Sequence, residues 1–252
     1  MLTGMQPTRS KPWLAYVVPM GIYMAFLLVQ SDANLLWMYP AKTIAVAAAL
    51  IWFRKQYPEL RSPMICLGPV VRGRETGAQQ ADDAARASVK RSDNGTAFQS
   101  WVLAVVVGLA AIVIWIGIDP YYPKFGKQGV FDPAIIQSVA QRNVFFAFRV
   151  FGAVIVVPVM EELFWRAFLI RYLVNEDFKS VAVGTFTGMS FGVTVALFGA
   201  EHYQWLAGLI CGAMYNWLYY RRKDVFACVV AHAVSNAALA AWVLARGDWK
   251  FW

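Results

Sequence analysis

The sequence predicts an all-α fold, a polytopic bundle of about seven transmembrane helices. Hydrophobic residues make up 59% of the 252 residues and charged residues only 15%, and the mean hydropathy is +0.48. A soluble domain of this size carries about 25% charged residues. The apolar excess falls in blocks near the ~20 residues that a helix needs to cross a bilayer. Helices are expected because lipid cannot satisfy the backbone of an open sheet.

Seven apolar blocks are the predicted spans. In chain order they are 13–29, 35–53, 101–118, 144–160, 181–200, 203–220 and 225–245. We treat the first block as a retained span rather than a cleaved signal peptide, because it is long and a second block follows at once. Between spans, the polar stretch 72–100 predicts a flexible inner loop, and 133–143 predicts a short surface helix.

The net charge of +8 reflects membrane topology rather than nucleic-acid binding. With the N-terminus inside, fifteen basic residues fall on inner segments, five on outer segments and three within spans. Inner segments of membrane proteins carry an excess of Lys and Arg. The count predicts an inner N-terminus and an outer C-terminus.

Small residues in two of the blocks predict close helix packing. Gly184, Gly188 and Gly192 repeat every four residues, as do Gly208 and Gly212. This spacing lets helix backbones approach each other in lipid. The three cysteines, Cys66, Cys211 and Cys228, show neither a disulfide framework nor metal-ligand spacing.

Ionisable residues in or directly beside three of the apolar blocks predict a functional site. Of the only two histidines, His232 lies in the last block and His202 directly follows the fifth, while Glu161, Glu162 and Arg166 continue the apolar stretch of the fourth. An ionisable group at bilayer depth costs roughly 2.5–3.5 kcal/mol on insertion scales, so it is by default functional or paired. Glu162 and Arg166 are four residues apart and can neutralise one another. Glu161 points about 100° away and has no local partner.

The remaining residues of the pattern add groups suited to hydrolysis. Phe198 and His202 share a helix face, as do His232 and Asn236. Glu161 with His202 can hold and deprotonate a water. His232 and Asn236 can donate hydrogen bonds to a developing oxyanion. These are the groups that peptide hydrolysis requires.

Two other interpretations of these residues stay open. The pairs could be structural contacts between helices, as in a non-catalytic immunity or scaffolding protein. Alternatively, Glu161, His202 and His232 could bind zinc, although the H-E-x-x-H spacing of helical zinc proteases is absent. Our prediction includes no metal and no cofactor.

Three motifs resemble those of a known family. Glu161-Glu162-x-x-x-Arg166, Phe198-x-x-x-His202 and His232-x-x-x-Asn236 occur in this order. They are similar to the motifs of the CAAX protease and bacteriocin-processing family (CPBP, also called Abi), which includes the type II CAAX prenyl endopeptidases. The resemblance covers roughly residues 144–245. We therefore expect two parts of the chain: residues 1–100 would form two accessory spans and the inner loop, and residues 101–252 would form a protease core. Glu201, beside His202, is an acid that the motifs do not include.

The resemblance implies a glutamate-type intramembrane endopeptidase. Glu161 and His202 would activate water, His232 and Asn236 would form the oxyanion hole, and Glu162, Arg166 and Phe198 would support the site. The expected partners are membrane lipid and a membrane-associated protein or peptide substrate, with no nucleic acid. The expected location is a prokaryotic inner membrane. Simple hairpins would place His202 near the outer face and His232 nearer the inner one, so convergence requires tilted or broken helices.

Overall fold

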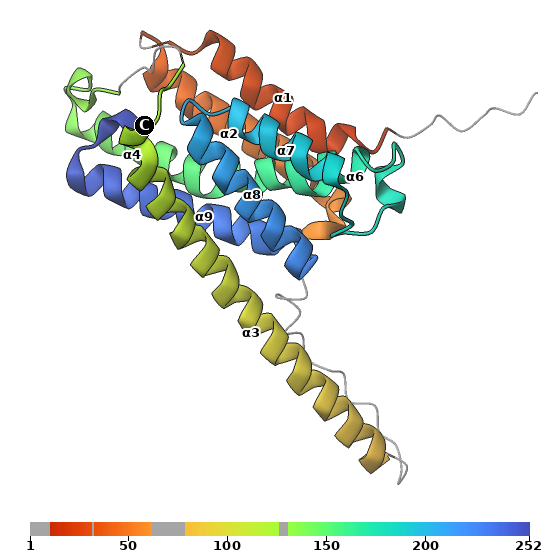
Figure 1. The fold of residues 1–252 in the computed structure, drawn as a ribbon. Coiled ribbons are helices and arrows are strands. Elements are labelled where there is room, and N and C mark those ends of the chain that lie inside the picture. Colours follow the sequence, from red (N-terminus) through yellow and green to blue (C-terminus); the bar gives the residue numbers. More distant parts are fainter. Residues whose placement is uncertain (1–10, 32, 62–78, 126–130) are drawn as a thin grey trace, which may run out of the picture.

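A helical bundle forms the part of the chain that the computed structural model describes, residues 11–31, 33–61, 79–125 and 131–252, with the helix alone described for 79–97 (Figure 1). Its helices are α1 (Leu14–Val29), α2 (Leu35–Phe53), α3 (Gln79–Ile118), α4 (Val139–Phe151), α5 (Val157–Glu162), α6 (Ile170–Tyr172), α7 (Gly188–Ala200), α8 (Trp205–Arg222) and α9 (Val225–Arg246). No strand occurs within these described ranges. The predicted all-α class is confirmed.

The helices have the length and surface of an integral membrane protein. Within the described ranges, four segments are long and apolar enough to cross a bilayer, namely Leu35–Gln56, Phe98–Tyr121, Val139–Tyr172 and Val225–Arg246. α1 and α7 are shorter apolar helices, and α8 lies at the predicted sixth span. Large apolar side chains face outward, with Leu28 87% exposed and Val113 71% exposed. Such a surface is suited to lipid rather than water.

Close helix packing depends on some of the predicted glycines and not on others. A Cβ on Gly208 would come within 3.0 Å of the Gly199 Cα, and one on Gly212 within 3.1 Å of the Phe198 ring. These contacts bring α7 against α8. The prediction for the other repeat is wrong: Gly188 and Gly192 face open space, and Gly184 precedes α7 in a left-handed conformation with φ +83°.

Three predicted boundaries also differ from the structure. The polar stretch from Gln79 is not a loop, because it continues α3, and this part of α3 projects from the bundle (Figure 1). The predicted surface helix at 133–143 is not a separate helix: it divides into a short 3-10 turn, Pro133–Ile135, and the first residues of α4, which begins at Val139. The fifth predicted span begins at Gly188 rather than residue 181.

Cys66 lies outside the described residues, and Cys211 and Cys228 are buried free thiols.

Polar contacts tie the bundle together at both ends. At one end, Arg171 Nη1 pairs with Glu59 Oε1 at 2.6 Å, and the Tyr16 hydroxyl donates to Glu59 Oε2 at 2.9 Å. At the other end, Asp119 pairs with Lys250 at 3.1 Å. The first set of contacts attaches the α1–α2 hairpin, residues 14–61, to the helix that carries Glu161. The division of the chain at residue 100 stays a prediction, but the hairpin packs directly on the core.

Candidate active site

The helix that carries the paired glutamates is irregular on both sides of them. α4, α5 and α6 form one continuous helix, Val139–Tyr172, interrupted by π-helical segments at Gly152–Val156 and Leu163–Leu169. π-helical turns are rare and occur mostly at functional sites, where they change the direction of side chains. Here they flank the short α5, which ends with Glu161 and Glu162.

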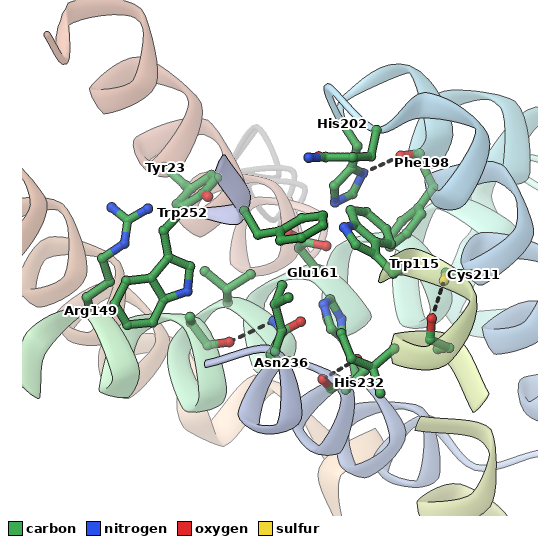
Figure 2. Close-up of a pocket in the computed structure, with 18 of the residues that line it drawn as sticks. Tyr23, Trp115, Arg149, Glu161, Phe198, His202, Cys211, His232, Asn236 and Trp252 are labelled. Atoms are coloured by element: carbon green, nitrogen blue, oxygen red, sulfur yellow. Dashed lines mark hydrogen bonds between the residues drawn. The ribbon is translucent and has the colours of Figure 1, made fainter. Parts of the chain in front are cut away.

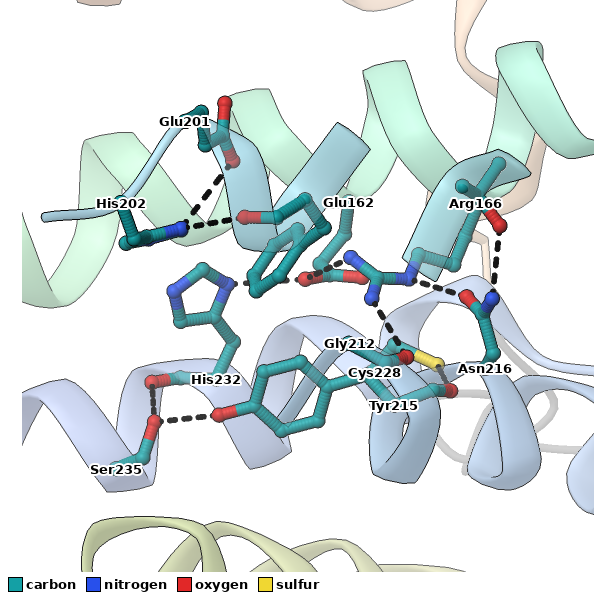
Figure 3. Close-up of polar contacts among 12 residues, drawn as sticks. Glu162, Arg166, Glu201, His202, Gly212, Tyr215, Asn216, Cys228, His232 and Ser235 are labelled. Carbon is teal, nitrogen blue, oxygen red and sulfur yellow. Dashed lines mark hydrogen bonds and ion pairs between the residues drawn. The ribbon is translucent and has the colours of Figure 1, made fainter. Parts of the chain in front are cut away.

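Glu162 and Arg166 form the buried ion pair that the sequence predicts. Arg166 Nη1 lies 3.1 Å from Glu162 Oε1, and both side chains are at most 1% exposed. Arg166 also donates through Nε to Asn216 Oδ1 at 3.2 Å and through Nη2 to the Gly212 carbonyl at 3.3 Å (Figure 3). These bonds satisfy three guanidinium donors at once and join the glutamate helix to α8.

Asn216 extends this network in a way that the sequence analysis missed. Its Nδ2 donates to Thr194 Oγ1 at 2.8 Å, and Thr194 donates to the Ser190 carbonyl at 2.7 Å. The network therefore reaches from Arg166 through α8 to α7. A signal for this role was present, because Asn216 is a polar residue within an apolar helix, and such residues in membranes usually bond across helices.

His232 is oriented by the same glutamate. Its Nδ1 lies 2.9 Å from Glu162 Oε1, and Tyr215 stacks on its ring with centroids 5.3 Å apart. A carboxylate can only accept, so Nδ1 is the donor and Nε2 is left for a group bound in the cavity. Glu162 thus accepts from both Arg166 and His232 (Figure 3).

His202 is oriented by the end of its own helix. Carbonyls in the last turn of a helix have no intrahelical partner. The Phe198 carbonyl accepts a 2.7 Å hydrogen bond from His202 Nδ1, which leaves Nε2 as the free ring nitrogen. The ring packs against Phe198 and Trp115, with centroids 4.9 and 5.2 Å away. His202 lies in the connection after α7, where burial lowers the pKa of its imidazole and favours the neutral ring.

Glu201 lies beside His202 in this connection. Its Oε1 is 3.8 Å from His202 Nδ1 and makes no hydrogen bond to the described residues. Burial raises the pKa of the Glu201 carboxyl above its usual value, because a low dielectric disfavours the charged form. The extra acid noted in the sequence is therefore part of the site's surroundings rather than an exposed outer residue.

Glu161, unlike Glu162, has no hydrogen-bond partner among the described residues. It is 5% exposed, and its Oε2 makes no hydrogen bond to any residue that the structure describes. One ligand atom each of Glu161, Glu201 and His202 lies within 4.8 Å of the others. The predicted distinction between a paired and an unpaired glutamate is confirmed within the described chain.

A single cavity brings the four predicted catalytic residues together. It has a volume of about 320 Å³ and is lined by Glu161, His202, His232 and Asn236 (Figure 2). Asn236 Nδ2 donates to the Ala153 carbonyl at 2.8 Å, which fixes the amide orientation and leaves one N–H available. The convergence follows from the length of α7: its 13 residues span only about 20 Å, so the chain turns at His202 well before a full crossing.

The grouping of possible metal ligands differs from the one that the sequence suggests. The clustered ligand atoms belong to Glu161, Glu201 and His202, whereas His232 is bonded to Glu162. Two carboxylates and an imidazole could hold a divalent ion such as zinc. The zinc interpretation therefore stays open with Glu201 in place of His232.

Comparison with known proteins finds one similarity, in the segment that carries the motifs. Residues 143–238 match the family model Rce1-like, described as type II CAAX prenyl endopeptidase Rce1-like. The chain is similar to that family over these residues, which we call the Rce1-like segment. The matched segment contains all three motifs and every predicted catalytic residue. No curated protein and no solved structure matches the chain.

Some residues of the cavity lie outside both the motifs and the matched segment. Tyr23, Gln30, Tyr39 and Lys42 come from the α1–α2 hairpin, and Phe251 and Trp252 come from the turn after α9. Sequence reasoning missed them, because the hairpin has no recognisable motif and its position on the core is a tertiary property. The Rce1-like segment thus forms one part of the cavity wall and the rest of the chain completes it.

Proposed function

We propose that the protein is an intramembrane endopeptidase that hydrolyses a peptide bond of a membrane-associated protein or peptide. The observation that carries this proposal is the unpartnered carboxylate of Glu161, next to His202 and in one cavity with His232 and Asn236. A buried base beside a second proton acceptor is suited to activating water. The Rce1-like match of the same segment supports a protease.

In the proposed reaction, water bound between Glu161 and His202 Nε2 loses a proton to Glu161. The resulting hydroxide attacks the scissile carbonyl carbon, and the electron pair of the C=O π bond moves to the carbonyl oxygen, which becomes an oxyanion. Collapse of this intermediate breaks the C–N bond, and Glu161 returns its proton to the leaving amine. One water is consumed, and the products are a new carboxyl group and a new amino group.

The oxyanion would be held by His232 and Asn236. Asn236 has one amide N–H beyond the bond to Ala153. His232 already uses its Nδ1 proton on Glu162, so a donating Nε2 requires the imidazolium form. The Glu162 carboxylate lies 2.9 Å from His232 Nδ1 and would therefore position the imidazole in the cavity.

The experiment that tests this function compares protein termini in cells. Cells that lack the gene are complemented with the wild type, Glu161→Gln or Glu176→Gln, and the membrane proteome is profiled for new termini. Glu176 is an exposed acid in the connection before α7 and provides a matched control. We expect the wild type and Glu176→Gln to produce the same new termini and Glu161→Gln to produce none. Identical termini in all strains would contradict the proposal.

A zinc-dependent hydrolase is the second candidate, favoured by the proximity of Glu161, Glu201 and His202. Chelation by EDTA or phenanthroline separates the two mechanisms. Activity that survives chelation supports a metal-free Glu161 mechanism. A loss of activity that is reversed by adding zinc supports the zinc mechanism.

We place the protein in a prokaryotic inner membrane, and its substrate need not be prenylated.

A further inference from the structure

Two basic side chains line the same cavity and play no part in the proposed mechanism. Lys42 comes from α2 and Arg149 from α4, and both lie within helices of the membrane bundle. In Figure 2 Arg149 lies on the far side of Glu161 from His202, with Trp252 between Arg149 and Glu161. The cavity therefore continues from the proposed catalytic residues to a wall that carries positive charge.

Lys42 is almost fully buried but has no acidic partner in the described chain. It is 3% exposed, and its Nζ donates to Gln30 Oε1 at 3.1 Å. The rings of Tyr23 and Tyr39 each lie 4.7 Å from Nζ. An ammonium has three donors, so this environment uses one donor and stabilises the charge only partly through the rings.

Arg149 shows the same lack of a counter-ion. Its guanidinium stacks on Tyr39 at 4.9 Å and on Trp252 at 5.3 Å. It forms no salt bridge and no side-chain hydrogen bond with another residue in the described ranges. Stacking occupies the face of the guanidinium and leaves its N–H edge, which binds carboxylates with two parallel bonds.

The contrast with Arg166 shows what Lys42 and Arg149 lack. Arg166 is buried like Lys42, and Arg149 is half-buried, but only Arg166 has a carboxylate at 3.1 Å, that of Glu162, among the described residues. An uncompensated charge at such depth is unfavourable and usually marks a binding site. Two such cations on one wall of a cavity would be completed by an anion. At about 320 Å³ the cavity is in the size range of small-ligand sites, too small for the two acyl chains of a phospholipid.

We propose that Lys42 and Arg149 form a subsite for a carboxylate of the peptide substrate. This rests on the proposed function, because the same cavity must hold the scissile bond. The carboxylate is either the carboxy terminus of the substrate or an acidic side chain near the scissile bond. Lys42 lies outside the Rce1-like segment 143–238, so the α1–α2 hairpin contributes to substrate selection.

Matched peptide pools test the subsite. The protein is placed in nanodiscs of zwitterionic phosphatidylcholine and given N-terminally lipidated decapeptides of randomised sequence. One pair of pools differs only in a free or an amidated carboxy terminus, and a second, amidated pair differs only in one Asp or one Asn. Mass spectrometry gives kcat and KM for each pool. A charge-assisted pair typically corresponds to about a 10- to 100-fold effect, so we expect that preference in kcat/KM, mainly through KM.

Variants assign the preference to the two cations. Lys42→Gln and Arg149→Gln should each lose most of the preference for the carboxylate, while kcat on the neutral pools changes little. Lys42→Arg and Arg149→Lys keep the charge and should retain part of it, which a merely structural role would not predict. Lys55→Gln removes an exposed positive charge just after α2 and is the matched control. The pair of pools that shows the preference identifies the source of the carboxylate.

Binding to the Glu161→Gln variant separates this proposal from the proposed function. If the variant binds carboxylate peptides in a Lys42-dependent way but the wild type cleaves no pool, the subsite stands and the protease proposal fails. If the wild type cleaves charged and neutral pools equally, the subsite is overturned and the protease proposal stands. Lys42-dependent binding of phosphatidylglycerol in place of peptide carboxylates would also overturn the subsite proposal. An unchanged preference for the carboxylate in both Lys42→Gln and Arg149→Gln would overturn it as well.

Discussion

Glu161 and Glu162 are neighbours in the chain with opposite environments. Glu162 accepts from Arg166 and His232, whereas Glu161 Oε2 has no partner in the described chain. Environments that separate two carboxylates in this way commonly separate their chemical roles. In our account Glu162 holds the oxyanion donor and Glu161 moves the proton.

Asn236→Ala should slow turnover without abolishing it. The substitution removes the amide N–H that is free of Ala153 and leaves Glu161 and His232 in place. Removing one oxyanion donor elsewhere costs about 10²–10³ in rate, and the loss should appear in kcat rather than KM. Steady-state kinetics on a cleaved peptide measures it. An unchanged kcat would remove Asn236 from the oxyanion hole.

Glu201→Gln should keep most of the activity. Glu201 lies beside His202, with its Oε1 3.8 Å from His202 Nδ1, but it takes no part in the proposed proton transfer. Steady-state kinetics on a cleaved peptide measures the effect. Complete loss of activity would instead favour Glu201 as a metal ligand.

At the scale of the element, the long helix Val139–Tyr172 connects stability with the site. Its π-helical segments flank α5, and Arg166 in the second segment bonds to Glu162, Asn216 and Gly212. The ion pair was predictable from the spacing of four residues, because both partners lie on one helix. Asn216 was not, since its contact depends on how α8 packs against this helix.

Arg166→Ala should destabilise the fold as well as the activity. The substitution leaves Glu162 buried with His232 as its remaining partner, and breaking a buried pair typically costs about 3–5 kcal/mol. We expect a lower yield of folded protein and an earlier thermal transition in detergent. Arg166→Lys keeps the charge but loses the fixed fork of donors, so its effect should be smaller. A fully stable Arg166→Ala protein would show that the pair contributes little to folding.

At the scale of the whole molecule, the composition predicted the class and the motifs predicted the grouping of residues. The hydrophobic blocks located the helices because membrane helices need long apolar runs. The start of α7 was wrong because residues 181–187 are as apolar as the helix that follows, and periodicity cannot mark that boundary. The cavity residues of the α1–α2 hairpin were also missed, because only the tertiary fold brings Lys42 and Tyr23 to the site.

The predicted topology is a further property of the whole chain. Contacts at one end of the bundle join Tyr16, Glu59 and Arg171, as expected if these residues share the inner face. Contacts at the other end join Asp119 and Lys250. With an inner N-terminus, reporter fusions after Arg91 and after Trp252 should report opposite sides of the membrane. The same side for both would contradict a seven-span topology.

The central claim is that Glu161 is the base of a peptide hydrolysis reaction, and Glu161→Gln tests it most directly. The amide keeps the size of the side chain and removes its ability to take a proton. Purified wild type, Glu161→Gln and Glu176→Gln are compared in liposomes, with turnover and peptide binding measured on the same preparations. We predict that Glu161→Gln binds peptide like the wild type but releases no product, while Glu176→Gln is fully active. A Glu161→Gln enzyme that still turns over at the wild-type rate would contradict the account.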